Sequence, residues 1–548
     1  MEKRLFITIA LCLGILMAWQ ILFPPPRRIA PQRAPVSTPS DQPIPIPAAP
    51  LATTTSATSP PSPERIVTVE TPRLRLGFST YGASVAKAEL LDPRFRKSGS
   101  DLPIDLAVTA PGEPRPLSSS VTGGAQLAAT DAWEVTAKSP RGVTFQRVAG
   151  ALTLIKSYDV AEDGFTVQVN VSAKNSSGAP IQADLSTLYP ELAPATNTSI
   201  STLQVRAICR AGDSVQRLGV DAKKPTLAVP GTVSFAGVDE HYFLAALVPV
   251  PAEGACELSN TLSSAGALVS TRLTQTLMVP ALGTTTKIFI AYFGPKSTEA
   301  LGAADTVGAR LEEAIEFGFF GIIARLLLTL LKAFHSVVPN WGVSIIVLTV
   351  AVKLATLPLT QKSMKSAQQM QQLQPHIEAL KKKHGADQQR MAAEQMKLFK
   401  EHGVSPLGGC LPMLLQMPIW IALYTALQTS AELYRAGFVP GWIPDLTAPD
   451  APISSLPWLH LLPLLMGASS YVTQALTPQT GQNAQQMKMM MYSMPLVFSY
   501  IMWSYPSGLT LYIFTSNLLS IVQQALIKRG KKAAGLSGVT TLEGSSAV

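Results

Sequence analysis

The stretch SIIVLTVAVKLATLPLT, residues 344–360, is an apolar run that is long enough to cross a bilayer, yet it contains Lys353. A charge at the middle of the membrane costs about 2.5–3.5 kcal/mol on insertion scales, so a lysine there is a candidate functional residue. The alternative is that its stem snorkels toward water, because Thr360 lies only roughly 10 Å further along a helix. The residues that share its helix face bear on this choice.

The whole chain has the composition of a membrane protein. Of its 548 residues, 47% are hydrophobic and only 14% are charged, which is rich in apolar residues and poor in charge for a soluble protein. We read the first apolar segment as an uncleaved anchor (domain 1–23), because no small-x-small cleavage site follows it. Residues 315–334 are interrupted by three charges, so they predict an amphipathic helix at the interface (domain 306–336). Six spans are predicted: 5–23, 344–360, 412–433, 457–476, 489–504 and 509–527.

Basic residues set the predicted topology. They gather in 361–411 and in the tail 528–548, whereas only Arg435 lies between the third and fourth spans. Because positive loops stay in the cytoplasm, both of these segments and both termini are expected inside, and residues 24–336 outside.

The external segment predicts a tether followed by a β domain. Residues 24–64 hold thirteen prolines and cannot build a core. Within 65–305, the stretch GFTVQVNVSAKN (164–175) alternates apolar and polar residues, which predicts an all-β sandwich. Cys209 and Cys256 lie in this domain and could pair, although their spacing leaves this open. No metal-ligand cluster, phosphate loop or nucleophile elbow occurs in the sequence, so we expect no cofactor, no enzymatic activity and no DNA partner.

Inside, residues 367–403 predict a helical hairpin. Met370, Leu373 and Ile377 recur at helical spacing, and HGAD at 384–387 offers a turn. A basic hairpin at a membrane can meet anionic lipid or ribosomal RNA, and the alternative is a solvated, self-packed pair of helices. The candidate partner-binding residues are Lys381, Lys382 and Lys383, with Lys528 and Arg529 in the tail.

Polar side chains form stripes on three predicted spans. Those around the lysine fall within an arc of roughly 60°: Thr349, Lys353, Thr356 and Thr360. Those of the last span fall within roughly 80°: Thr510, Asn517, Ser520 and Gln524. A looser stripe on the third span has Gln416, Trp420, Tyr424 and Gln428. Such residues can bond their own backbone or a neighbouring helix, but three stripes with a charge predict a hydrated cavity that opens inward.

Three long motifs resemble the YidC/Oxa/Alb insertase family of the Gram-negative type. They are HSVVPNWGVSIIVLTVAVKLATLPLTQKSMKSAQQMQQLQP (335–375), GVSPLGGCLPMLLQMPIWIALYTAL (403–427) and YPSGLTLYIFTSNLLSIVQQALI (505–527), and FSTYGASVAKAEL (78–90) extends a weaker similarity outward. The resemblance implies a groove with one buried basic residue, which matches Lys353, although arginine is usual there. Thr349 also matches a groove position. The tyrosine pair typical of the last span is here Tyr512 followed by Ile513, so a role for the second aromatic does not carry over.

The resemblance implies an architecture and a set of partners. The expected fold is a polytopic α-helical membrane protein of six spans, with a five-helix insertase core at 337–527 and a large all-β sandwich periplasmic domain. It would insert and chaperone nascent membrane proteins in the bacterial inner membrane. The implied partners are these nascent chains, the ribosome, the Sec translocon, the signal recognition pathway and the lipid bilayer.

Two alternatives stay open. A secondary transporter would also place a charge in a span, but we see no inverted repeat. A membrane-anchored sugar-binding protein is suggested because the family's outer domain resembles mutarotase-like sandwiches, although His241 is the only histidine there.

Overall fold

The computed structural model describes residues 64–97, 100–110, 112–193, 205–220, 225–263, 266–384, 388–403, 411–450, 459–476 and 484–538. The predicted anchor and nearly all of the tether therefore lie outside the described residues. Contacts divide the chain into two units, Met1–Ala314 and Ile315–Val548. The end that we predicted for the sandwich, residue 305, lies within the first unit.

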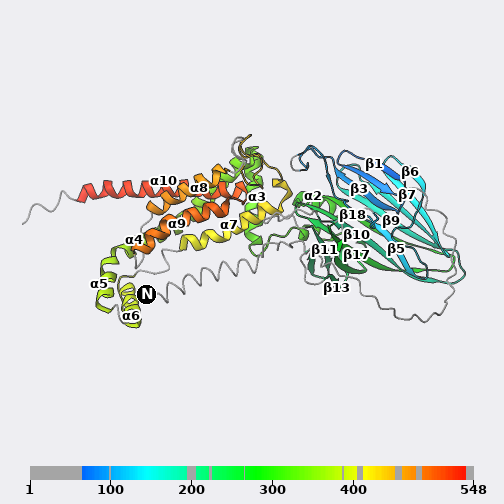
Figure 1. Ribbon diagram of the computed structural model, residues 1–548, viewed down its shortest axis with the longest axis horizontal. Coiled ribbons are helices and arrows are strands. Elements are labelled where there is room, and N and C mark those ends of the chain that lie inside the picture. Colours follow the sequence, from blue (N-terminus) through cyan, green and yellow to red (C-terminus); the bar gives the residue numbers. More distant parts are fainter. Residues whose placement is uncertain are drawn as a thin grey trace, which may run out of the picture. The chain divides into compact units, whose positions relative to one another are not determined.

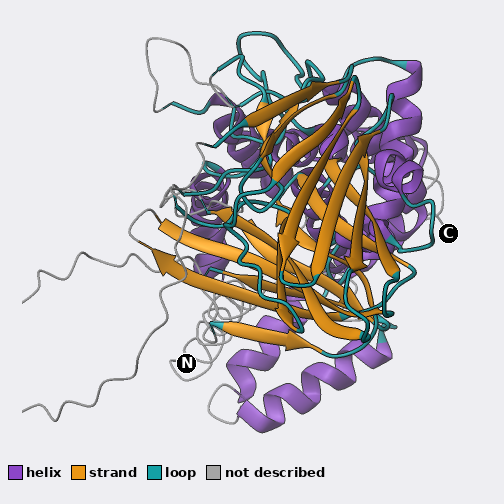
Figure 2. Ribbon diagram, turned by 90° about the vertical axis from the view of Figure 1, so that its right-hand side faces the viewer, coloured by secondary structure: helices purple, strands orange, loops and turns teal. Residues whose placement is uncertain are grey.

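The first unit is built of antiparallel strands in three sheets (Figures 1 and 2). The small sheet has β1 (Ile66–Glu70), β2 (Leu74–Ser79), β3 (Ser84–Leu90) and β4 (Ile104–Asp105). The five-stranded sheet runs β13 (Thr226–Val229), β16 (Ala255–Ser263), β17 (Gly266–Val279), β10 (Ile181–Leu192), β5 (Ser118–Gly123). The nine-stranded sheet runs β12 (Ser214–Gly219), β11 (Val205–Ala211), β14 (Val233–Glu240), β15 (Phe243–Val250), β18 (Thr284–Pro295), β9 (Thr166–Asn175), β8 (Leu152–Val160), β7 (Gly142–Ala149), β6 (Glu134–Ser139).

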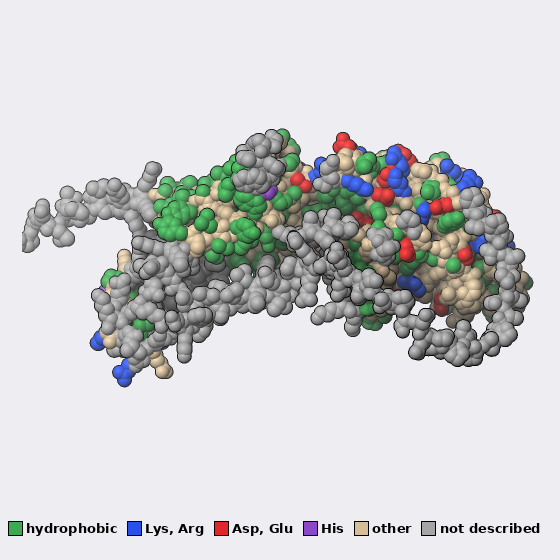
Figure 3. Space-filling view, viewed as in Figure 1, with side chains coloured by type: hydrophobic (Ala, Val, Ile, Leu, Met, Phe, Trp, Pro, Cys, Tyr) green, Lys and Arg blue, Asp and Glu red, His purple; other side chains and the backbone are tan. Residues whose placement is uncertain are grey.

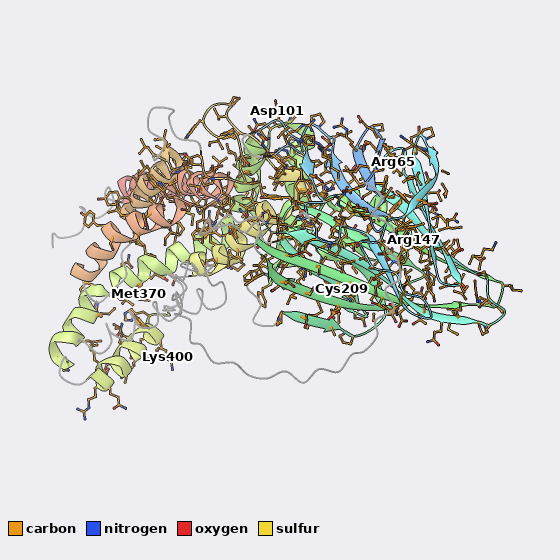
Figure 4. All side chains as sticks on the ribbon, turned by 45° about the vertical axis from the view of Figure 1, so that its right-hand side comes forward. Arg65, Asp101, Arg147, Cys209, Met370 and Lys400 are labelled. Atoms are coloured by element: carbon orange, nitrogen blue, oxygen red, sulfur yellow. A yellow bond between two sulfur atoms is a disulfide. The ribbon has the colours of Figure 1, made fainter. Side chains whose placement is uncertain are left out.

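The two larger sheets pack on each other through their inward-facing side chains. On β9, Val167, Val169 and Val171 are buried while the residues between them are not, which is the alternation that the sequence predicted. A disulfide between Cys209 of β11 and Cys256 of β16 joins the nine-stranded sheet to the five-stranded one. Figure 4 labels Cys209. The predicted β-sandwich is therefore confirmed, and the pairing that the spacing left open is present.

The end of the first unit is fastened to the sandwich. After β18 follow α2 (Thr298–Ala304) and the 3-10 helix η1 (Leu311–Ala314). Arg210 of β11 forms an ion pair with Glu313 at 2.7 Å, and Arg217 of β12 donates to the carbonyls of Glu313 and Ala314. These bonds satisfy carbonyl groups at the end of η1, so the chain leaves the domain from a fixed point.

The second unit is helical. Its elements are α3 (Gly321–Val337), α4 (Trp341–Gln372), α5 (Gln374–His384), α6 (Gln388–Glu401), α7 (Leu411–Thr429), η2 (Ala431–Leu433), α8 (Leu461–Leu476), α9 (Ala484–Met502) and α10 (Ser507–Gly538). Within the described residues, two helices are long and apolar enough to cross a membrane, Trp341–Ser366 and Ser507–Leu526, and Leu461–Leu476 and Tyr492–Met502 are shorter apolar helices. The number of six spans stays a prediction.

The surface of the second unit is apolar over its helices, whereas charged side chains are scattered over the strands of the first unit (Figure 3). Leu496 and Val497 of α9 are 72% and 52% exposed, and Ile322 and Leu326 of α3 also point outward. Water would not tolerate such a large apolar surface, so these faces are suited to lipid.

Helices α5 and α6 form the predicted hairpin. Leu373 and Phe399 form a buried apolar cluster, and the partly buried Met370 and Ile377 pack against it. In Figure 4, Met370 marks the end of α4 that leads into this hairpin and Lys400 marks α6. The hairpin thus has a small core of its own.

Candidate functional site

Lys353 is directed at a neighbouring helix. It lies on α4, is half-buried, and its Nζ donates to Oγ of Ser520 on α10 at 2.9 Å. The Ser520 hydroxyl in turn donates to the carbonyl of Ser516 at 2.9 Å. The lysine therefore crosses to α10 in this structure and does not run along its own helix.

The threonines beside the lysine bond within α4. The hydroxyls of Thr349, Thr356 and Thr360 each donate to the carbonyl four residues earlier, at 2.6, 2.8 and 2.8 Å. Thr349 is fully buried, and the other two are half-buried. These three hydroxyls therefore bond the backbone of their own helix. Of the four described residues of this stripe, Lys353 is the one that bonds another helix.

The stripe on α10 contacts another helix as well. The Asn517 amide donates to Ser469 and Ser470 of α8 at 3.1 and 2.8 Å. Thr510 is buried, and its hydroxyl donates to the carbonyl of Pro506, the residue just before α10, at 3.3 Å. The last helix thus places Ser520 toward α4 and Asn517 toward α8.

The third predicted stripe, on α7, reaches α10, α9 and the α9–α10 turn. Gln416 donates to the hydroxyl of Tyr512 on α10 at 3.0 Å. The Trp420 ring stacks on Phe498 of α9 with centroids 5.8 Å apart, and the Tyr424 ring lies 5.5 Å from that of Tyr505. This stripe therefore supplies bonds and ring contacts between helices.

Several buried polar atoms of the second unit have no hydrogen-bond partner within the described part of the chain, and two of these are donors on α7 and α10. These two donors are Nε1 of Trp420 and Nε2 of Gln523. Buried donors of this kind are normally satisfied by water. Their positions on α7 and α10 are therefore suited to internal water.

One end of the helical unit is closed by the segment 434–450, between η2 and α8. Its carbonyls at Leu446 and Ala448 accept from the amides of Gly508 and Ser507 at the start of α10, at 2.9 and 2.7 Å. A Cβ atom on Gly342, at the start of α4, would lie 2.2 Å from the Phe438 ring. This contact requires glycine, so the segment packs closely on the starts of α4 and α10.

The packing loosens toward the other end of the same helices. On α4, Thr349 is fully buried, Lys353 is half-buried and Leu354 is 63% exposed. On α10, Tyr512 is 1% exposed while Val522 is 55% exposed. The lysine lies where the helices change from closely packed to exposed, on the side that leads to the hairpin.

The other candidate residues are placed only in part. Lys383 is exposed on α5, while the side chains of Lys381 and Lys382 are outside the described residues. Lys528 and Arg529 continue the α10 helix, but their side chains are likewise not described.

Sequence reasoning missed the bonding partners on α8 and the closing segment. The motif GASS at 467–470 was a signal for the first, because small polar residues favour close helix contacts. No comparable signal pointed to the segment 434–450.

Comparison with known proteins gives matches over nearly the whole chain. Residues 333–534 match the family model described as 60Kd inner membrane protein, and residues 66–330 match the YidC periplasmic domain. The protein named membrane protein insertase YidC from Anaeromyxobacter dehalogenans (strain 2CP-C) is 38% identical over 97% of this chain and 98% of its own. Its namesake from Geotalea daltonii is 31% identical over 97% and 100%.

Two solved structures are similar in part. A crystal structure of an active YidC insertase with the first transmembrane domain resolved is 20% identical, with a TM-score of 0.36, and covers 84% of this chain and 92% of that one. A galactose mutarotase related enzyme from Lactobacillus acidophilus is 10% identical, with a TM-score of 0.32, over 42% of this chain and 97% of that one.

Proposed function

Since this chain belongs to the YidC family of membrane protein insertases, we propose that it receives the polar outer segment of a nascent membrane protein in a hydrated groove beside Lys353 that opens to the cytoplasm. The protein is an insertase of the bacterial inner membrane, not an enzyme, and carries a periplasmic β-sandwich domain. The observation that carries the proposal is the position of Lys353, half-buried and bonded to α10 where the packing of the helices loosens.

The groove lowers the cost of moving polar groups through the membrane. An unsatisfied backbone group in hydrocarbon costs several kcal/mol, so a groove that admits the segment halfway shortens the distance over which this cost applies. The unbonded donors of Trp420 and Gln523, which water would satisfy, support a hydrated interior. The closed end at the segment 434–450 supports an opening on the cytoplasmic side alone.

Lys353 supplies attraction for acidic residues of the entering segment. At an effective dielectric near 20, a close pair of opposite charges is worth up to about 4 kcal/mol. The apolar helix of the substrate then leaves along α7 and α9 into lipid, and this transfer supplies the free energy, so insertion needs no nucleotide. Each leucine or isoleucine contributes about 0.3–0.6 kcal/mol on the insertion scale.

The proposed topology has six spans, with both termini and residues 361–411 in the cytoplasm and residues 24–336 in the periplasm. The disulfide between Cys209 and Cys256 supports the external position of the sandwich, since such bonds persist in oxidising compartments. The lysines of the hairpin support its internal position.

The proposed partners of the hairpin and the tail are the ribosome, the signal recognition pathway, the Sec translocon and anionic lipid. The exposed Lys383 supports such contacts, and the hairpin's own core at Leu373 and Phe399 would let its surface bind without unfolding.

Crosslinking to stalled nascent chains tests the groove. A photoreactive residue at Thr356, beside the lysine, should capture the nascent chain, while one at the buried Ile345 near the closed end should not. Capture from neither position, or equally from both, would contradict a groove that opens inward.

A further inference from the structure

The Lys353 ammonium is held by one serine. We propose that Ser520 is a positioning residue that holds Lys353 between α4 and α10, and that it thereby sets the preference of the insertase for substrates with acidic outer segments. This inference rests on the proposed function of Lys353 as the cation of the groove.

The geometry makes Ser520 an oriented acceptor. Its hydroxyl hydrogen is committed to the carbonyl of Ser516 at 2.9 Å, so the lone pairs of Oγ face the ammonium of Lys353, also at 2.9 Å. A lysine ammonium has three donors and no acceptor, so this hydroxyl complements it. Without the serine, a flexible four-carbon stem would spread over several rotamers and could turn toward water.

Ser520 holds the charge without neutralising it. Among the described residues, Lys353 forms no ion pair with a carboxylate, and Ser520 is its side-chain partner. Two ammonium hydrogens stay available for a substrate, and a carboxylate is a stronger acceptor for them than a hydroxyl. A permanent Asp or Glu partner at this position would instead compete with the substrate.

The bond lies where a substrate can reach it. Ser520 and Lys353 are both half-buried, so the bond is partly open to its surroundings. On the same face of α10, Ser516 and Gln524, one turn before and after Ser520, are only 5% and 7% exposed.

The test compares Ser520→Ala and Ser520→Thr in cells depleted of the native insertase, with paired substrates whose outer segments are acidic or neutral. Ser520→Ala should lower insertion of the acidic substrate about tenfold, the scale of one hydrogen bond to a charged group, and leave the neutral one nearly unchanged. Ser520→Thr keeps the hydroxyl and should restore insertion.

Asn517→Ala is the matched control, because Asn517 lies one turn away on α10 but donates to Ser469 and Ser470 of α8. It should affect both substrates alike. If Ser520→Ala also affects both alike, or if threonine does not rescue it, the serine serves packing and the proposal is wrong.

Lys353→Ala in the same assay distinguishes failure of the groove cation from failure of the positioning role of Ser520. If it spares the acidic substrate, the groove cation itself is refuted. If it impairs the acidic substrate while Ser520→Ala behaves like wild type, only the positioning role is overturned.

Discussion

The buried Lys156 should make the free energy of unfolding of the periplasmic domain rise with pH, whereas a lysine whose pKa is raised by a partner would make it fall. Lys156 is fully buried on β8, and its Nζ donates to the Leu117 carbonyl and, at 2.8 Å, to Ser119 of β5. Burial lowers the pKa of Lys156 from 10.5 to about 7. Between these values the unfolded chain binds one more proton than the folded domain, so stability rises with pH across this window.

The size of the effect follows from the shift. One pKa unit corresponds to about 1.4 kcal/mol, and the wild-type domain should gain roughly 2 kcal/mol from this group between pH 7 and pH 9. Lys156→Met removes that gain. The variant also leaves the Leu117 carbonyl without its donor, which costs about 1–3 kcal/mol but does so equally at every pH.

Urea midpoints of the periplasmic domain in the full-length protein, read by pulse proteolysis at pH 7, 8 and 9, measure the difference between variant and wild type. Lys138→Met, which changes an exposed lysine on β6 of the same sheet, is the control and should leave the pH dependence unchanged. The reasoning is refuted if Lys156→Met keeps the wild-type rise with pH.

Three further predictions concern other parts of the chain. Burial and the neighbouring Glu240 carboxyl hold the pKa of Glu191 well above its usual range, so the stability that protonated Glu191 contributes to the domain is complete below about pH 4.5 and is lost as pH rises through the folded pKa. In urea titrations from pH 5 to 8, Glu191→Gln should lack this loss of stability. A loss equal to that of wild type would contradict the interaction between the Glu191 and Glu240 carboxyls. Because Cys209 and Cys256 are joined, two of the four cysteines should react with a maleimide reagent in the denatured chain before reduction, whereas reaction of all four would show that this disulfide is absent. Glutamate at residues 381–383 should slow insertion while detergent stability stays nearly unchanged, and an equal fall in both would indicate a purely structural hairpin.

The sequence predicted those features that depend on local periodicity. Alternation of valines identified β9 as a strand with one buried face, and apolar length identified the spans that became α4 and α10. The self-packed hairpin also follows from local spacing, because Leu373 and Phe399 lie in one buried cluster. In each case the period of the backbone fixes which side chains share a face.

The features that depend on neighbours could not be predicted in this way. Periodicity places Ser520 and Asn517 on one face of their helix, but it does not say that one bonds α4 and the other α8. The same limit applies to the disulfide, since Cys209 and Cys256 meet only through the packing of two sheets. The threonines of α4 proved to bond their own backbone, a choice that a polar stripe leaves undecided.

The most direct test of the groove cation is a charge series at Lys353, measured with paired acidic and neutral substrates in cells depleted of the native insertase. Lys353→Arg should retain insertion, Lys353→Ala should impair the acidic substrate, and Lys353→Glu should impair it most, because attraction of up to about 4 kcal/mol becomes repulsion. The neutral substrate should tolerate alanine, since it depends on helix hydrophobicity and groove water. Indifference of both substrates to Lys353→Glu would contradict the account and leave the lysine without a role in substrate recognition.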